Sequence, residues 1–129
     1  NILHIIEEMR MGGWYRQPAF FCEGIAANIH LSVNLSNAGR TQAFVSDLAD
    51  SVEAAKELPS GQMLSVVREM MEAHGEQILD QPEVLMAAAG MEKDRLPERM
   101  AAINEVLDFL PPQRREKILL EVTNRFFHP

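Results

Sequence analysis

The sequence predicts an α+β fold, in which a short antiparallel sheet is covered by helices and followed by a helical extension. Two segments, 14–21 and 28–34, are rich in strand-forming residues, and the second alternates apolar and polar side chains. Elsewhere the apolar residues recur at helical spacing. The change in character falls near Pro59. We therefore expect an α+β core over residues 1–58 and a helical extension over residues 59–129, packed together as one structural unit of a longer chain.

A short amphipathic helix is predicted over residues 2–11, because its isoleucines and Met9 lie on one helical face. Asn1 is a favourable N-cap, and Gly12-Gly13 supplies the stop that a helix needs. His4 lies one turn before Glu8, which indicates a surface pair. This helix should lead directly into the first strand.

The two predicted strands differ in character. Residues 14–21 are aromatic, but Pro18 lacks an N–H donor and indicates an edge position or the end of strand pairing. Gly24 allows a bend in the loop over residues 22–27. Ile29, Leu31 and Val33 then alternate with polar residues, so the second strand can pair antiparallel with the first. Such a sheet is marginal alone, and its edge should be exposed.

The rest of the chain is predicted to be helical. A long helix over residues 42–58, capped by Thr41, should pack its apolar stripe across one face of the sheet. Another helix covers residues 62–74 and ends at Gly75. Three further helices are expected, from Pro82 to Gly90 with Asp80 and Glu83 at capping positions, from Pro97 to Leu110, and from Gln113 to the end of the chain.

Composition restricts the class of protein. The apolar fraction of 47% and the charged fraction of 24% are those of ordinary globular domains. A net charge of −7 argues against a nucleic-acid surface and against an anionic membrane. The densest basic group, residues 114–117, is expected on a solvated helix face. Cys22 is the single cysteine, no signal peptide is visible, and no segment approaches the ~18 apolar residues of a membrane span, so we expect a cytoplasmic protein.

The residue patterns predict no catalytic, cofactor-binding or metal-binding residue. The four histidines have no ligand spacing, and no phosphate-binding loop is present. Glu7-Glu8 and the pair Asp47 and Asp50 are expected on solvated helix surfaces, since nothing indicates a cleft. Cys22 and the methionine stripe of residues 63–71 are expected to be packing residues rather than a nucleophile or a peptide-binding groove.

Three motifs carry a resemblance to a known family. They are Glu8-Met9 followed by Gly13-Trp14-Tyr15, the strand Asn28–Val33, and Phe44 with Asp47-Leu48. Their order resembles the small C-terminal domain of pyridoxal-phosphate (PLP) enzymes of the aspartate-aminotransferase fold type, and most closely the group II decarboxylases and sphingosine-phosphate-lyase-like enzymes. The likeness extends over residues 4–57 and is weak after residue 59, where it rests on residues 87–91 and 107–110.

The resemblance implies that this chain closes one side of an active-site cleft. In that family the Schiff-base lysine and the other PLP ligands come from a large domain upstream, and Lys56, Lys93 and Lys117 do not match their context. His30 would lie near the active-site entrance. The implied partners are the large PLP-binding domain of the same chain and a second subunit in a homodimer, with no nucleic acid and no membrane span. The alternatives are a stand-alone helical module for protein interaction or dimerisation, and an independent small enzyme.

Overall fold

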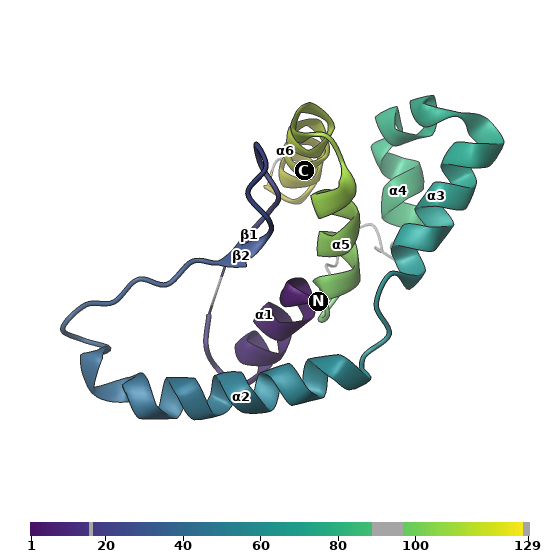
Figure 1. The fold of residues 1–129 in the computed structure, drawn as a ribbon. Coiled ribbons are helices and arrows are strands. Elements are labelled where there is room, and N and C mark those ends of the chain that lie inside the picture. The colour runs from purple at the N-terminus through teal and green to yellow at the C-terminus, as the bar shows by residue number, and fades with distance from the viewer. Residues whose placement is uncertain (16, 89–96, 128–129) are drawn as a thin grey trace. The chain divides into compact units, whose positions relative to one another are not determined.

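The computed structural model describes residues 1–15, 17–88 and 97–127, and it divides the chain into two compact units, residues 1–60 and 61–129. Most of the described residues are helical, and one short two-stranded antiparallel sheet lies in the first unit (Figure 1). The predicted α+β fold class is therefore confirmed. Each unit is described by itself below.

The first unit begins with α1, Ile2–Met11, which has the predicted bounds. The Asn1 side chain accepts a hydrogen bond from the Leu3 amide at 3.0 Å, so the predicted N-cap is confirmed. Gly13 follows the helix with φ +88°, a conformation that favours glycine. The amide of Trp14 then donates to the Met9 carbonyl at 2.8 Å, which turns the chain back along the helix end.

The sheet consists of β1, Pro18–Ala19, and β2, Asn28–Ile29, paired antiparallel with Pro18 opposite Ile29. Both strands are much shorter than predicted. Pro18 cannot donate to a ladder, and only one further bridge, between Cys22 and Ile25, extends the hairpin towards its turn. Beyond Ile29 the alternating segment continues as chain without strand pairing among the described residues. Two strands alone do not bury enough apolar surface to sustain a longer ladder.

The long helix α2, Thr41–Glu57, follows the 3-10 turn η1, Ala38–Arg40. It crosses α1 at an incline and packs against it, with Ser51 and Ala55 buried (Figure 1). Its main support is therefore a helix rather than the sheet face that the sequence predicts. The hydroxyl of Thr41 donates back to the Ala38 carbonyl at 2.9 Å, so Thr41 joins the helix to η1 instead of capping it.

The second unit is helical throughout its described residues. It contains α3, Gln62–His74, the 3-10 turn η2, Glu76–Asp80, then α4, Pro82–Ala88, α5, Ala101–Phe109, and α6, Pro112–Phe127. The bounds of α3 are as predicted, and the amide of Gly75 (φ +79°) donates to the Met71 carbonyl at 2.8 Å. The predicted end of α4 at Gly90 lies outside the described residues.

The start of α5 differs from its prediction. The helix begins at Ala101, four residues after Pro97, and a bend at Glu98 precedes it. A proline suits a turn as well as a first helical position, so Pro97 alone does not fix a helix start. Helix α3 packs on α5, η2 and α4, and α6 packs on α4. The most deeply buried large side chains of this unit are Val67, Leu79 and Leu110.

Candidate functional site

Trp14 is the centre of the most organised side-chain cluster in the first unit. Its ring is only 8% exposed and meets the Phe44 ring edge-to-face, with centroids 5.2 Å apart and an interplanar angle of 82°. Its indole N–H donates to the Asp47 carboxylate at 2.6 Å. The Arg40 guanidinium lies over the indole face, 4.7 Å from the ring centroid. These contacts tie the end of α1 to the first turns of α2.

A hollow of about 270 Å³ opens beside this cluster. The Asn37 side chain fixes its loop wall, because it donates to the Ser32 carbonyl at 2.8 Å and accepts from the Asn34 amide at 2.9 Å. The lining combines an aromatic floor, aliphatic walls and polar edges. Its residues are Trp14, Leu31, Ser32, Val33, Asn37, Arg40, Thr41, Phe44 and Val45.

His30, the residue expected near an active-site entrance, lies directly after β2 and is exposed. It precedes Leu31, the first residue of the hollow's lining, but is not itself part of that lining. The structure thus places His30 beside the hollow, and its functional role stays a prediction. The residues that sequence reasoning missed are Arg40 and Asn37, which only the folded loop brings next to Trp14.

Three residues expected on solvated surfaces, His4, Glu7 and Asp47, have other environments in the structure. Glu7 and His4 are both buried, with exposed fractions of 5% and 4%, so neither belongs to a solvated face of α1. Asp47 is engaged with Trp14 rather than simply solvated. The buried positions on α1 form a broad band, comprising Leu3, His4, Ile6, Glu7 and Met9. A narrow apolar stripe predicts part of this band, but not the polar residues within it.

The second unit has two adjacent arginines with different roles. Arg115 donates to three carbonyls around the end of α5, those of Leu107 at 2.7 Å, Leu110 at 3.2 Å and Asp108 at 3.3 Å. It thus satisfies carbonyls that have no partner within the helix, and it braces the turn between α5 and α6. The expectation that this basic group is only a solvated face is therefore wrong for Arg115.

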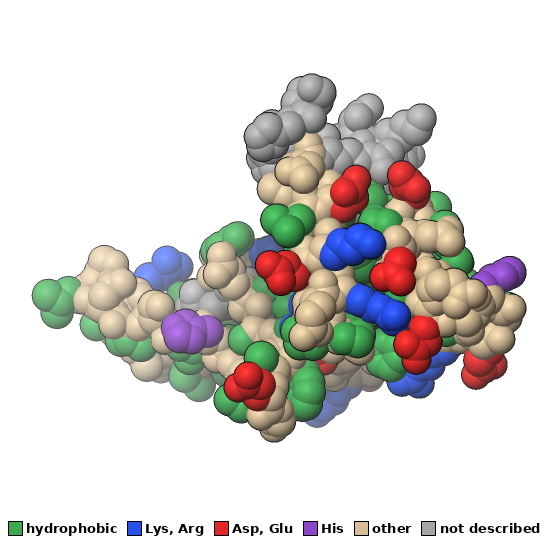
Figure 2. All heavy atoms as spheres, turned by 90° about the horizontal axis from the view of Figure 1, so that it is seen from above, with side chains coloured by type: hydrophobic (Ala, Val, Ile, Leu, Met, Phe, Trp, Pro, Cys, Tyr) green, Lys and Arg blue, Asp and Glu red, His purple; other side chains and the backbone are tan. Residues whose placement is uncertain are grey.

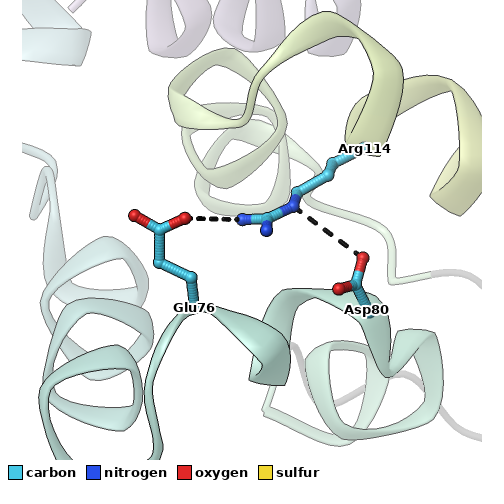
Figure 3. Close-up of polar contacts among 3 residues, drawn as sticks. All are labelled: Glu76, Asp80 and Arg114. Atoms are coloured by element: carbon cyan, nitrogen blue, oxygen red, sulfur yellow. Dashed lines mark hydrogen bonds and ion pairs between the residues drawn. The ribbon is translucent and has the colours of Figure 1, made fainter.

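Arg114 points to a different element. Its guanidinium reaches the Glu76 carboxylate at 3.4 Å and the Asp80 carboxylate at 3.8 Å, so it bridges α6 to both ends of η2 (Figure 3). Both carboxylates are well exposed, which limits the stabilisation from this pair of contacts.

Another polar tether joins α3 to α5. The Glu105 carboxylate is 5% exposed and accepts from the Gly61 amide at 2.8 Å, just before α3 begins.

A small apolar cavity of about 70 Å³ lies among the helices of the second unit. Its lining is aliphatic and contains three methionines. The residues are Met63, Val67, Leu85, Met86, Met100, Ile103, Val106, Leu107, Leu110, Ile118, Leu119 and Val122.

Of the three lysines in the sequence, the structure describes Lys56 and Lys117, and both lie exposed on helices. A Schiff-base lysine needs a pocket that holds the ring and phosphate, whereas Lys56 is exposed on α2 and pairs with Glu53 at 2.6 Å. Lys117 is exposed on α6, and Lys93 lies outside the described residues.

Over the described ranges, no group of three or more His, Cys, Asp and Glu side chains is arranged to hold a metal ion. No helix in those ranges is both long and apolar enough to cross a membrane.

Comparison with known proteins assigns the helical unit to a class of enzyme domains. A short turn at Leu110 and Pro111 joins α5 to α6. Residues 61–125, just over half of the chain, match the family described as "Pyridoxal-dependent enzyme, C-terminal putative HTH domain". The chain belongs to this family. No curated protein and no solved structure matches it.

Proposed function

We propose that this chain is the C-terminal domain of a PLP-dependent carboxy-lyase, either a decarboxylase or an aldehyde-lyase, and that it closes one side of the active-site cleft. The family match supports a place at the C-terminal end of a pyridoxal-dependent enzyme. In this proposal, the large domain of the same chain binds PLP, and residues 1–129 supply no catalytic group. Domain closure then excludes water from the reacting centre.

The observation that carries the proposal is an uncovered apolar segment in the first unit. Ile25, Val33 and Leu35 have exposed fractions of 65%, 80% and 99%. The sequence has no Asp, Glu, Lys or Arg from residue 24 to residue 39, so no charged side chain of this segment faces water. An exposed, uncharged apolar surface indicates contact with another part of the protein. The large PLP-binding domain is the partner that we propose for it, with His30 near the active-site entrance.

The helix-turn-helix description of the family suggests nucleic acid as another partner. The arrangement of the charged side chains argues against binding to nucleic acid. The first basic residues of α6 are engaged internally, Arg115 with the end of α5 and Arg114 with η2. On the face drawn in Figure 2, acidic and basic side chains are interspersed instead of gathered by sign. Phosphate binding requires several outward cations. We therefore propose that α5 and α6 serve as protein packing elements and bind no nucleic acid.

The alternative function is a stand-alone helical module for protein interaction or dimerisation. Leu119 and Leu120 of α6 are substantially exposed, which favours a protein contact on this helix. Within the enzyme, the same surface would support the homodimer that we propose. A reducing cytoplasmic location belongs to the proposal as well, since Cys22 is a free thiol. Cys22 is exposed, so the expectation that it is a packing residue is wrong.

The experiment tests closure in the parent enzyme, encoded by this chain with its upstream sequence. Val33→Glu places a charge on the proposed contact surface, and Val66→Glu on α3 is the matched control, since that valine is also exposed. We expect Val33→Glu to reduce kcat by at least about tenfold, an effect of about 1.4 kcal/mol on the barrier, with PLP absorbance retained. Val66→Glu should leave both kcat and the PLP absorbance unchanged.

Two results would contradict the proposal. A parent protein that binds no PLP removes the enzyme assignment, and equal turnover of the two variants removes the cleft-closing role. Carbon dioxide release from an amino acid, measured against aldehyde release from a phosphorylated amino alcohol, then separates decarboxylation from carbon–carbon cleavage. Sedimentation of the isolated chain adds a further check, because an uncovered apolar surface should cause self-association.

A further inference from the structure

Arg40 is the one charged residue among the described residues that line the hollow beside Trp14. Arg40 is the only Asp, Glu, Lys or Arg between Glu23 and Asp47, in a chain whose net charge is −7. Among the described residues, neither the Arg40 guanidinium nor the Ser32 hydroxyl has a hydrogen-bond partner, although both line the hollow. Asp47 forms its hydrogen bond with the indole N–H of Trp14. The hollow thus contains unused donors beside an apolar wall.

The geometry of Arg40 suits a carboxylate. The Arg40 guanidinium carbon lies over the indole ring, 4.7 Å from its centroid, and the N–H donors of this group have no acceptor among the described residues. The planar edge of a guanidinium matches the two oxygens of a carboxylate. Ser32 adds a hydroxyl donor to the lining of the hollow.

The remaining walls suit a small apolar body. Phe44, Leu31 and Val45 provide aromatic and aliphatic surface around the hollow. Its volume of about 270 Å³ is near the lower end for ligand pockets, which selects a molecule of the size of a single amino acid. The floor and the loop wall are held in advance, because Asp47 fixes Trp14 and Asn37 fixes Ser32. Such preorganisation lowers the cost of binding.

We propose that this hollow binds an amphipathic carboxylate, with the carboxylate on the Arg40 guanidinium and an aryl or branched aliphatic group against Phe44 and Leu31. This inference is argued from the 129-residue chain, and it requires that the contact proposed for Val33, which also lines the hollow, leave the hollow open. Trp14 is the only tryptophan in the sequence, so its fluorescence reports directly on the floor of the hollow.

The test is a fluorescence titration of the chain with 3-phenylpropionate, its neutral analogue 3-phenylpropanol, and inorganic phosphate. We expect saturable binding of the carboxylate with a Kd of about 1 mM, and at least about tenfold weaker binding of the alcohol and of phosphate. R40Q should weaken carboxylate binding at least about tenfold, and R40K should give an intermediate Kd because it keeps the charge but loses the planar edge.

The matched control is R68Q. Arg68 also lies over an aromatic ring, that of Phe109 at 5.1 Å, but it does not line this hollow. R68Q should leave the Kd for 3-phenylpropionate unchanged. Equal binding of the alcohol or of phosphate, or an unchanged Kd in R40Q, would overturn the proposal. Circular dichroism of each variant confirms that the helices remain, and the indole N–H resonance of Trp14 gives a second readout that should shift with carboxylate in the wild type and not in R40Q.

Discussion

Arg115 and Arg114 are adjacent in sequence, yet the structure predicts that their replacement by methionine has very different effects. Methionine keeps a long apolar side chain and removes the charge and the donors. Arg115→Met deletes three hydrogen bonds to carbonyls at the end of α5, of which the shortest is 2.7 Å. A hydrogen bond from a charged group contributes about 1.5–3 kcal/mol. The two longer bonds are weaker, and the site is partly solvated, so we expect a total loss of about 2 kcal/mol.

Arg114→Met removes only contacts to exposed carboxylates, at 3.4 Å and 3.8 Å. Exposed ion pairs contribute about 0–1 kcal/mol, so the expected loss is about 0.5 kcal/mol or less. The assay is urea unfolding of the full chain followed by circular dichroism, with hydrogen exchange of the amides near Leu107–Leu110 as a local readout. Arg115→Met should speed exchange there, and Arg114→Met should not. A greater loss for Arg114→Met than for Arg115→Met would refute the assignment of the two roles.

Three further changes test other contacts. Asp47→Ala leaves the buried indole N–H of Trp14 without its acceptor, and should cost about 1–3 kcal/mol in unfolding monitored by Trp14 fluorescence. Glu105→Ala removes the buried acceptor of the Gly61 amide and should lower the free energy of unfolding by about 2 kcal/mol, measured by circular dichroism in urea. Gly75→Ala places a side chain at φ +79° and should lower the Tm, with a cost of about 1–2 kcal/mol.

Each of these changes has a control of the same chemistry. Asp50→Ala and Glu72→Ala remove exposed carboxylates on α2 and α3, so each should change stability by less than about 0.5 kcal/mol. Gly39→Ala adds a methyl group that meets no atom within 4 Å, at a glycine without positive φ. It should be neutral or slightly stabilising. A buried-site variant no more destabilised than its control would show that the corresponding contact is absent in solution.

Local chemistry accounts for what the sequence predicts well. Asn1 and Gly12-Gly13 bound α1, and Gly61 and Gly75 bound α3, because caps and positive φ act within a few residues. Strand length depends instead on the partner that each strand finds. Residues 28–34 alternate as a strand should, but among the described residues only Asn28 and Ile29 of this segment pair, since β1 begins at Pro18, which cannot donate to the ladder.

The candidate site was harder to predict for the same reason. Trp14 and Phe44 are thirty residues apart, and their contact depends on α2 packing against α1. Nothing in the sequence around Arg40 indicates a special role, because its contact with the indole ring exists only in the folded chain. Glu7 is expected on the surface because carboxylates are seldom buried without partners, yet it is buried. Whether a single residue of this kind is buried or exposed depends on tertiary contacts, and the periodicity of the sequence does not show those contacts.

The family match and the motif resemblance fall on different halves of the chain. Motifs such as Trp14-Tyr15 and Asn28–Val33 suggest the PLP-enzyme small domain through residues 4–57, whereas the family match covers residues 61–125. Helical segments contain few distinctive short motifs, because many apolar combinations satisfy the same stripe. A match over a whole domain sums many weak preferences and can therefore detect what motif reading cannot. The main motifs of the resemblance lie before residue 61, while its weaker ones, residues 87–91 and 107–110, lie within the family match. Both signals indicate a pyridoxal-dependent enzyme, and together they support the proposed place of this chain.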